Sequence, residues 1–237
     1  MTEAGSLLLP YVKNVVEQYH AMQEVLETYT QENNLSLNIL TIPTMINYQG
    51  FSKITEFLKH HPEFTVQLKE VESIELTYDD TNEHSDTIHF ARSFQAPPSS
   101  IEWLPTETDD FVAVLPKTHP LAAKKKLDLS ELKKENFLVL GPTTNLYQPV
   151  LDLCREAGFE PRISYKGSRT DLIINMIAND MGIAIVMEKT VKNLLKENTV
   201  ILPISPTKES YLAFTRKIGE HSLASDTFWE YLKQEEN

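Results

Sequence analysis

The first thirty residues carry an apolar position at alternating intervals of four and three residues. This spacing is the a/d repeat of a left-handed coiled coil, and the intervening positions are mostly polar. It predicts one long helix, with Thr2 and Ser6 as candidate N-caps, in which Pro10 is tolerable only within the first turn. A helix lying on the core of its own domain is the alternative, but so regular a seam favours a second helix as partner. The seam positions are Leu8, Val12, Val15, Tyr19, Met22, Leu26 and Tyr29.

Beyond a polar linker at 30–34, short strands alternate with helices. Apolar runs and period-two alternation predict strands at 35–42, 64–68, 88–91, 111–115, 137–140, 162–165, 183–186, 200–204 and 211–216. Helical spacing predicts helices at 51–60, 73–76, 148–157, 170–180 and 189–195, and a last one that includes 227–232. This alternation indicates parallel sheets built from right-handed crossovers, and the large number of strands favours two α/β lobes.

Composition and charge argue against several classes of protein. The 237 residues include 22 Lys+Arg and 34 Asp+Glu, a formal charge of 22 − 34 = −12, which argues against a nucleic-acid surface. The run Lys124–Lys126 is therefore interpreted as a solvated loop. The single cysteine excludes an internal disulfide and suits a reducing cytoplasm. No apolar run approaches the roughly 18–20 residues of a membrane helix, and the N-terminus does not have the pattern of a secretion signal.

The sequence shows no established catalytic motif. It has no GxxxxGK phosphate loop, no GxGxxG turn and no GxSxG nucleophile elbow. The seven histidines lack the spacing of a metal site, and Cys154 shares the apolar face of its predicted helix with Val150 and Ala157. We therefore expect neither an enzyme nor a bound cofactor or metal.

Several segments, in order, resemble one family. They are TEAG at 2–5 followed by LLLP and a long helix, FLKHHPEF at 57–64, VAVLPKTHPLA at 112–122, EAGFEP at 156–161 and DLIINMIANDMGIAIV at 171–186. Together they resemble the linker helix and regulatory domain of LysR-type transcriptional regulators over nearly the whole chain. The winged helix-turn-helix that precedes the TEAG-like stretch in that family is missing from this sequence.

The resemblance implies the fold of type-2 periplasmic binding proteins. In that fold two Rossmann-like α/β lobes are joined by two crossover strands, here after an N-terminal linker helix. Residues 1–34 are expected to form the linker and dimerisation helix. Lobe I is placed at 35–111 plus 214–237 and lobe II at 112–213, with the strands at Val112 and Tyr211 crossing between them.

A small ligand in such a fold binds in the cleft between the lobes, outside the carboxyl ends of the strands. Polar residues follow predicted strands at three helix starts, and they match the positions where the family holds its effector. Each can instead be only a helix cap, and Arg92 and Arg169 can be either counter-charges or surface charges. The predicted ligand residues are Pro43, Thr44, Met45, Ser73, Arg92, Thr143, Thr144, Asn145, Leu146 and Arg169. An anionic organic molecule is expected; a neutral one stays open, because Met45, Leu146 and Met187 can form an apolar wall.

The predicted function is the effector-sensing and oligomerisation domain of a LysR-type regulator. We expect a cytoplasmic homodimer or homotetramer, with helices at 52–60 and 170–180 as the second contact. DNA would be bound only through the missing domain, and no membrane is involved. Two alternatives stay open: a solute-binding protein that delivers a ligand to a transporter, and an enzyme on the same fold. The first should carry an export signal and no heptad helix, and the second a convergent set of catalytic groups.

Overall fold

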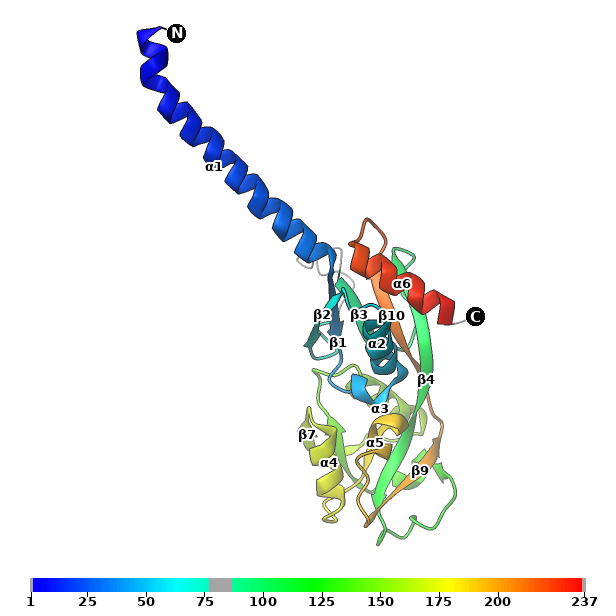
Figure 1. Cartoon of the computed structure of the whole chain (residues 1–237). Coiled ribbons are helices and arrows are strands. Elements are labelled where there is room, and N and C mark those ends of the chain that lie inside the picture. Colours follow the sequence, from blue (N-terminus) through cyan, green and yellow to red (C-terminus); the bar gives the residue numbers. More distant parts are fainter. Residues whose placement is uncertain (1, 77–86, 236–237) are drawn as a thin grey trace.

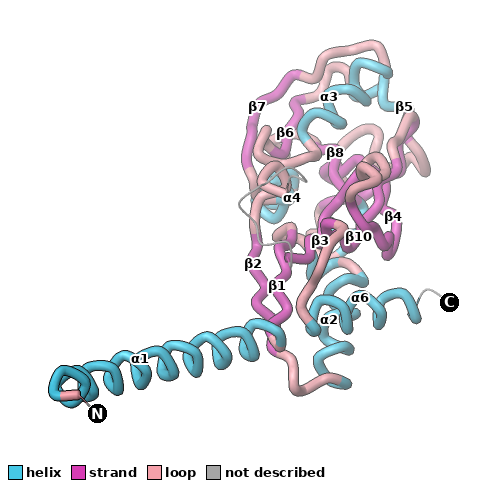
Figure 2. The backbone as a smooth tube through the Cα atoms, turned by 90° about the horizontal axis from the view of Figure 1, so that it is seen from above, coloured by secondary structure: helices cyan, strands magenta, loops and turns pink. Residues whose placement is uncertain are grey.

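A 32-residue helix, α1 (Glu3–Asn34), projects away from the body of the chain (Figures 1 and 2). The computed structural model describes residues 2–76 and 87–235, with side chains except at 3–7, 24–34 and 235. Pro10 is the eighth residue of α1, so its expected place in the first turn is wrong. Proline lacks one backbone donor, and a helix this long tolerates the loss of one hydrogen bond. Within the described residues, no helix combines the length and apolar character that crossing a membrane requires.

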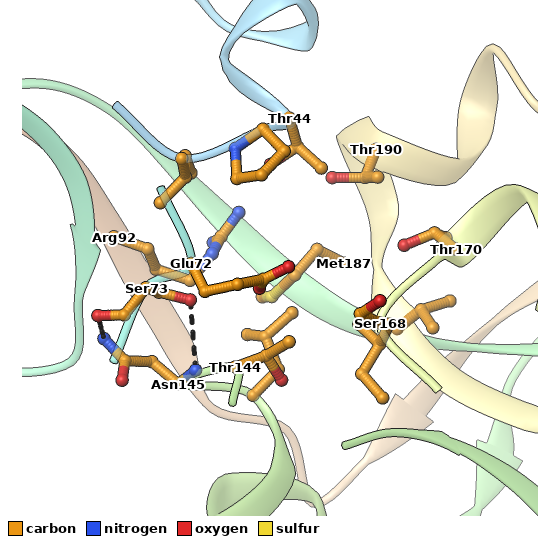
Figure 3. Close-up of a pocket in the computed structure, with 15 residues that line it drawn as sticks. Thr44, Glu72, Ser73, Arg92, Thr144, Asn145, Ser168, Thr170, Met187 and Thr190 are labelled. Carbon is orange, nitrogen blue, oxygen red and sulfur yellow. Dashed lines mark hydrogen bonds between the residues drawn. The ribbon is translucent and has the colours of Figure 1, made fainter. Parts of the chain in front are cut away.

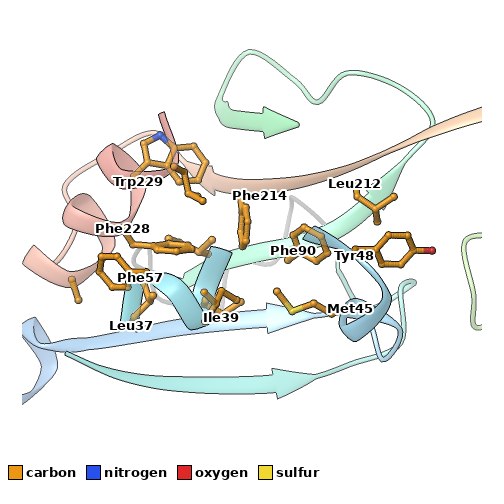
Figure 4. Packing of buried hydrophobic residues seen from close by; sticks show 14 of the residues in the cluster. Leu37, Ile39, Met45, Tyr48, Phe57, Phe90, Leu212, Phe214, Phe228 and Trp229 are labelled. Atoms are coloured by element: carbon orange, nitrogen blue, oxygen red, sulfur yellow. The ribbon is translucent and has the colours of Figure 1, made fainter. Parts of the chain in front are cut away.

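Lobe I is built on three parallel strands, β1 (Ser36–Thr41), β2 (Thr65–Glu70) and β3 (Thr87–Ser93). Helices α2 (Gln49–His60) and α6 (Leu223–Glu235) pack against this sheet, and the short 3-10 helix η1 (Met45–Asn47) precedes α2. Aromatic side chains fill the space between them (Figure 4), with Phe57, Phe90, Phe214, Phe228 and Trp229 almost completely buried. A Cβ atom on Gly50 would clash with the buried Phe90 ring, so α2 needs glycine at this approach to β3.

Two long strands run from one lobe into the other. They are β4 (Ile101–Pro116) and β10 (Glu209–Lys217), which pair antiparallel with each other. The second half of β4 then pairs with strands of lobe II. The first half of β4, residues 101–110, was not predicted as a strand, because its sequence IEWLPTETDD is rich in charged and polar residues and contains a proline.

Lobe II contains five further strands and three helices. The strands are β5 (Leu127–Asp128), β6 (Asn136–Leu140), β7 (Arg162–Gly167), β8 (Ala184–Met187) and β9 (Thr199–Ser205). The helices are α3 (Tyr147–Glu156), α4 (Thr170–Ile177) and α5 (Glu188–Lys192), with a 3-10 turn, η2 (Leu129–Leu132). Alternate residues of β4 point into two separate apolar clusters, and Cys154 is fully buried in one of them. Burial raises the pKa of the Cys154 thiol to about 12, as expected for a core residue and not a nucleophile.

The strands β1, β2 and β3 of lobe I and the pair β6-β7 of lobe II are parallel as expected, but the crossing strands make the large sheet a mixed one. Its strand order is β2-β1-β3-β10-β4-β9-β5, with β8 paired to β4 and β6-β7 forming a separate parallel pair. The crossing strands run antiparallel to β3, β8 and β9 because they connect the lobes instead of belonging to a crossover unit. The helix predicted at 73–76 is wrong: residues 73–75 form a turn, in which the N–H of Glu75 donates to the carbonyl of Glu72 at 2.8 Å.

Candidate functional site

Four loops from the two lobes meet at one pocket. In lobe I they follow β1 and β2, and in lobe II they follow β6 and β7. Each pair of strands is parallel, so each lobe presents the carboxyl ends of its strands to the other. The pocket has a volume of about 60 Å³. That volume holds roughly four water-sized spheres of ~10–15 Å³ and is far below the ~300–1,000 Å³ of typical ligand pockets.

We call this space the inner pocket. Its wall combines an apolar side with hydroxyl, amide, carboxylate and guanidinium groups (Figure 3). It is lined by Ile42, Pro43, Thr44, Glu72, Ser73, Arg92, Leu140, Thr144, Asn145, Leu146, Ser168, Thr170, Val186, Met187 and Thr190.

Seven of the ten residues predicted from the sequence line the inner pocket. They are Pro43, Thr44, Ser73, Arg92, Thr144, Asn145 and Leu146. The other three lie elsewhere. Met45 is only 3% exposed and packs in the core of lobe I. Thr143 is outside the lining, and its carbonyl accepts from the N–H of Ile74 at 3.3 Å. The Arg169 side chain is 72% exposed and pairs with Asp171 instead.

The two lobes touch directly at the rim of the inner pocket. The backbone N–H of Asn145 donates to Ser73 Oγ, and Asn145 Nδ2 donates to the Ser73 carbonyl, each at 3.2 Å (Figure 3). These two residues were expected to hold a ligand, but here they bind each other. The contact ties the lobes together on this side of the cleft, and the pocket beside it holds only a few water-sized groups, so a larger ligand needs a more open arrangement of the lobes.

Thr44 and Thr144 differ in whether their hydroxyls already make a hydrogen bond that supports the local turn. Thr44 precedes η1 but makes no side-chain capping hydrogen bond, so its hydroxyl at the pocket wall has no structural task as a cap. Thr144 Oγ1 donates to the Gly141 carbonyl at 2.9 Å, which supports the turn after β6. A hydroxyl that donates once still has lone pairs to accept with. Both hydroxyls can therefore contact a ligand.

Arg92 is a buried, paired charge. Its guanidinium donates to Asp109 Oδ2 at 3.2 Å, and the exposed fractions of the two side chains are 4% and 1%. It also donates to the hydroxyls of Tyr48 and Ser210 and lies 5.3 Å from the centre of the Tyr48 ring. The expected role of Arg92 as a counter-charge for a ligand is therefore weakened, because Asp109 already balances its charge.

The same network joins the lobes behind the pocket. Tyr48, before α2, donates to Asp109 Oδ2 at 2.8 Å and shares a 2.7 Å hydrogen bond with Thr190 of α5. The N–H of Lys189 donates to Asp109 Oδ1 at 3.1 Å. Burial raises the pKa of the Tyr48 phenol above its usual range, so this hydroxyl keeps its proton. Asp109 thus accepts hydrogen bonds from both lobes on the strand that connects them.

Sequence reasoning missed several polar residues of the lining. Ser168 and Thr170 follow β7 as Thr44 follows β1, so the same strand-end signal could have found them. Glu72 lies among charged residues that read as a solvated face, and Thr190 lies in a helix with no distinctive motif. Only the packing of the lobes brings these two into the pocket.

A larger cavity adjoins the inner pocket. Its volume is about 570 Å³, and residues of both lobes line it. It shares Arg92, Thr144 and Asn145 with the inner pocket. The two cavities therefore adjoin at these three residues. In the described part of the chain, no cluster of three His, Cys, Asp or Glu residues is placed to hold a metal ion.

Comparisons with known sequences agree on one family. The model of the LysR substrate binding domain matches residues 30–237. The transcriptional dual regulator GltC of Bacillus subtilis (strain 168) is 28% identical over 129 residues, covering 54% of this chain and 43% of GltC. The uncharacterized HTH-type regulator YwbI of the same organism is 27% identical over 205 residues, covering 81% of this chain and 64% of YwbI. The chain thus spans less than two thirds of these relatives.

The fold is also found in a solved regulatory domain. The CcmR regulatory domain of Synechocystis PCC6803, in complex with 2-PG, superposes with a TM-score of 0.72 at 20% identity and covers 84% of this chain and 96% of its own. This likeness confirms the predicted fold class of two α/β lobes joined by crossing strands. With the family model matched over 208 consecutive residues, 30 to 237, the chain belongs to the LysR substrate-binding-domain family.

Proposed function

We propose that this chain is the effector-sensing and oligomerisation part of a LysR-type transcriptional regulator. A small molecule bound between the lobes would control DNA binding by a winged helix-turn-helix outside these 237 residues. The inner pocket carries the proposal, because residues from the carboxyl ends of strands in both lobes line it. The relatives GltC and YwbI are transcriptional regulators, and CcmR was solved with a small molecule bound.

Ligand binding in this chain would work by changing the lobe arrangement. The inner pocket is small and the contact between Ser73 and Asn145 ties the lobes together beside it, so a ligand must bind a more open arrangement or hold the lobes at a new separation. A ligand shifts such an equilibrium by its difference in affinity for the two arrangements. We keep the predicted lobe boundaries, 35–111 plus 214–237 and 112–213, as part of the proposal. Separate apolar clusters support a division into two lobes, but Leu212 packs in the lobe I cluster and Phe111 in a lobe II cluster, so the packing crosses each boundary by one or two residues.

The chain is proposed to be cytoplasmic, a homodimer or homotetramer, and not an enzyme. Phe51 on α2 and Leu172 on α4 are exposed apolar residues that suit the predicted second contact between copies. The alternative of a solute-binding protein is less favoured, because the exposed heptad seam of α1 has no use in a monomeric carrier.

Removing a single hydroxyl should weaken ligand binding. A thermal-shift screen of metabolites would first identify a ligand, and titrations would then compare Thr44→Val and Thr144→Val with the parent. Each variant should bind about tenfold more weakly, the effect of one lost hydrogen bond of ~1.5 kcal/mol. Thr227→Val is the matched control, because Thr227 lies on α6, outside both the pocket lining and the proposed contacts, and its hydroxyl donates to the Leu223 carbonyl one turn earlier. If both pocket variants bind like the parent, the site lies elsewhere; if the screen finds no ligand, the proposed function is wrong.

The chain by itself should not bind duplex DNA. Its charge is −12, and Lys124 of its only lysine run pairs with Glu131. Affinity for the phosphate backbone comes mainly from unpaired Lys and Arg. A gel shift with micromolar protein at physiological salt should show free DNA only. A salt-sensitive shift would contradict this expectation, and variants of the lysines at 124–126 would then locate the contact.

A further inference from the structure

We propose that Glu72 sets the charge preference of the inner pocket, so that its ligand presents a cationic or neutral hydrogen-bond donor and not a carboxylate. This inference rests on the proposed function and names the class of ligand for the same site. It decides between the anionic and neutral ligands that the sequence left open.

The charges of the lining carry the inference. Among its fifteen residues the ionisable side chains are Glu72 and Arg92. Arg92 is balanced by Asp109, which lies behind the lining at 3.2 Å. Arg169, the other arginine expected here, pairs with Asp171 and points to solvent. The pair of Arg92 and Asp109 is neutral, so the net charge that the pocket presents is that of Glu72.

Glu72 is placed to contact a ligand. It follows β2 and its side chain extends across the middle of the pocket, between Thr44 on one side and Thr144 on the other (Figure 3). Burial, and then the negative charge of Glu75, raise the pKa of the Glu72 carboxyl above its ordinary value. Both effects mean that the ionised carboxylate is poorly compensated by its surroundings. A ligand that donates a hydrogen bond or brings a positive charge supplies that compensation.

A carboxylate ligand would not compensate the negative charge of Glu72. Two negative charges at contact distance in a partly buried site repel each other, and the free cation that could neutralise them is lacking in the lining. The hydroxyls of Thr44, Ser168 and Thr170 do not select a ligand by its charge, because a hydroxyl both donates and accepts hydrogen bonds. The apolar wall of Ile42, Leu140, Leu146, Val186 and Met187 suits a small hydrocarbon ring once the lobes open, because the pocket of about 60 Å³ holds only water-sized groups. Glu72 therefore distinguishes ligands of the same shape by their charge.

Benzamidine, benzamide and benzoate test this distinction, because they share a ring and shape but carry positive, zero and negative charge. Ligand-observed NMR of the full 237-residue chain would measure their dissociation constants up to about 20 mM. Benzamidine or benzamide should bind at least about tenfold more tightly than benzoate. In Glu72→Gln this preference should fall to within about threefold. Glu197→Gln, which removes the same charge from an exposed loop residue outside the lining, should keep it.

Three results would overturn the inference: benzoate binding as tightly as the other two probes, a preference that survives in Glu72→Gln, or no binding of any probe. The first two leave the proposed function intact, because a ligand still binds between the lobes. The proposed function fails instead when the wider metabolite screen finds no ligand, whatever its charge. The two failures are therefore distinguishable.

Discussion

Replacing Asp109 with alanine is expected to lower the free energy of unfolding by about 3–5 kcal/mol. The carboxylate is 1% exposed and balances the buried guanidinium of Arg92. It also accepts from the Tyr48 hydroxyl and from the N–H of Lys189. Its removal leaves a buried positive charge and two donors without their partner, which costs more than the hydrogen bonds contribute net. Urea denaturation followed by circular dichroism measures the change.

Asp152→Ala is the control for Asp109→Ala. Asp152 also pairs with an arginine, Arg155, at 3.1 Å, but the two side chains are about half exposed. An exposed pair contributes ~0–1 kcal/mol, so this variant should unfold almost like the parent. The double variant Arg92→Met/Asp109→Ala should lose less than the sum of the two single variants, because it removes the unpaired charge. Equal losses in Asp109→Ala and Asp152→Ala would show that the buried network does not stabilise the fold.

The position of this network explains why sequence reasoning could not identify the carboxylate that pairs with Arg92. An arginine at the end of a strand beside a predicted cleft is a reasonable partner for an anion. What neutralises it is Asp109, seventeen positions along the chain, in a stretch too polar to be predicted as a strand. The register of β10 against β3 and β4 brings Ser210 to the same place. Such contacts depend on tertiary pairing, which no local pattern records.

Local patterns did predict most of the fold. Apolar patterning located α2 and α3 by helical spacing, β7 by alternation, and β1 and β6 by apolar runs that are mostly buried on both faces of the strand. It failed at the first half of β4, where burial is partial and the pairing with β10 supplies the stability, and at residues 73–76, where a turn replaces the helix. Thr44 and Thr144 were found because polar residues that directly follow a predicted strand mark the loop at its carboxyl end. The carboxylate of Glu72 was not, because a surface and a pocket glutamate look alike in sequence.

Where the structure describes its side chains, the apolar stripe of α1 is not covered by the rest of the described chain. Leu8, Val12, Val15, Tyr19 and Met22 are each between 52% and 68% exposed, and Leu26 and Tyr29 lie where the structure describes no side chains. Leu9 and Val16, at 40% and 46% exposure, widen the stripe on one side of the a/d seam. The helix projects from the body of the protein, so its own lobes do not cover it (Figures 1 and 2). A second copy of the same helix would bury these residues in both chains.

Replacing Val15 with glutamate should therefore raise the dissociation constant of the dimer by at least about a hundredfold. Each dimer would lose two buried valines, worth about 1–1.5 kcal/mol apiece at this exposure, and would place two carboxylates opposite each other. Asn14→Glu adds the same charge one position away on the outer face, so it should leave the dimer unchanged. Sedimentation equilibrium of the parent and both variants measures the difference, and circular dichroism checks that the lobes stay folded. A parent chain that is monomeric at tens of micromolar, or equal dissociation constants for the two variants, would show that the stripe is not the dimer contact.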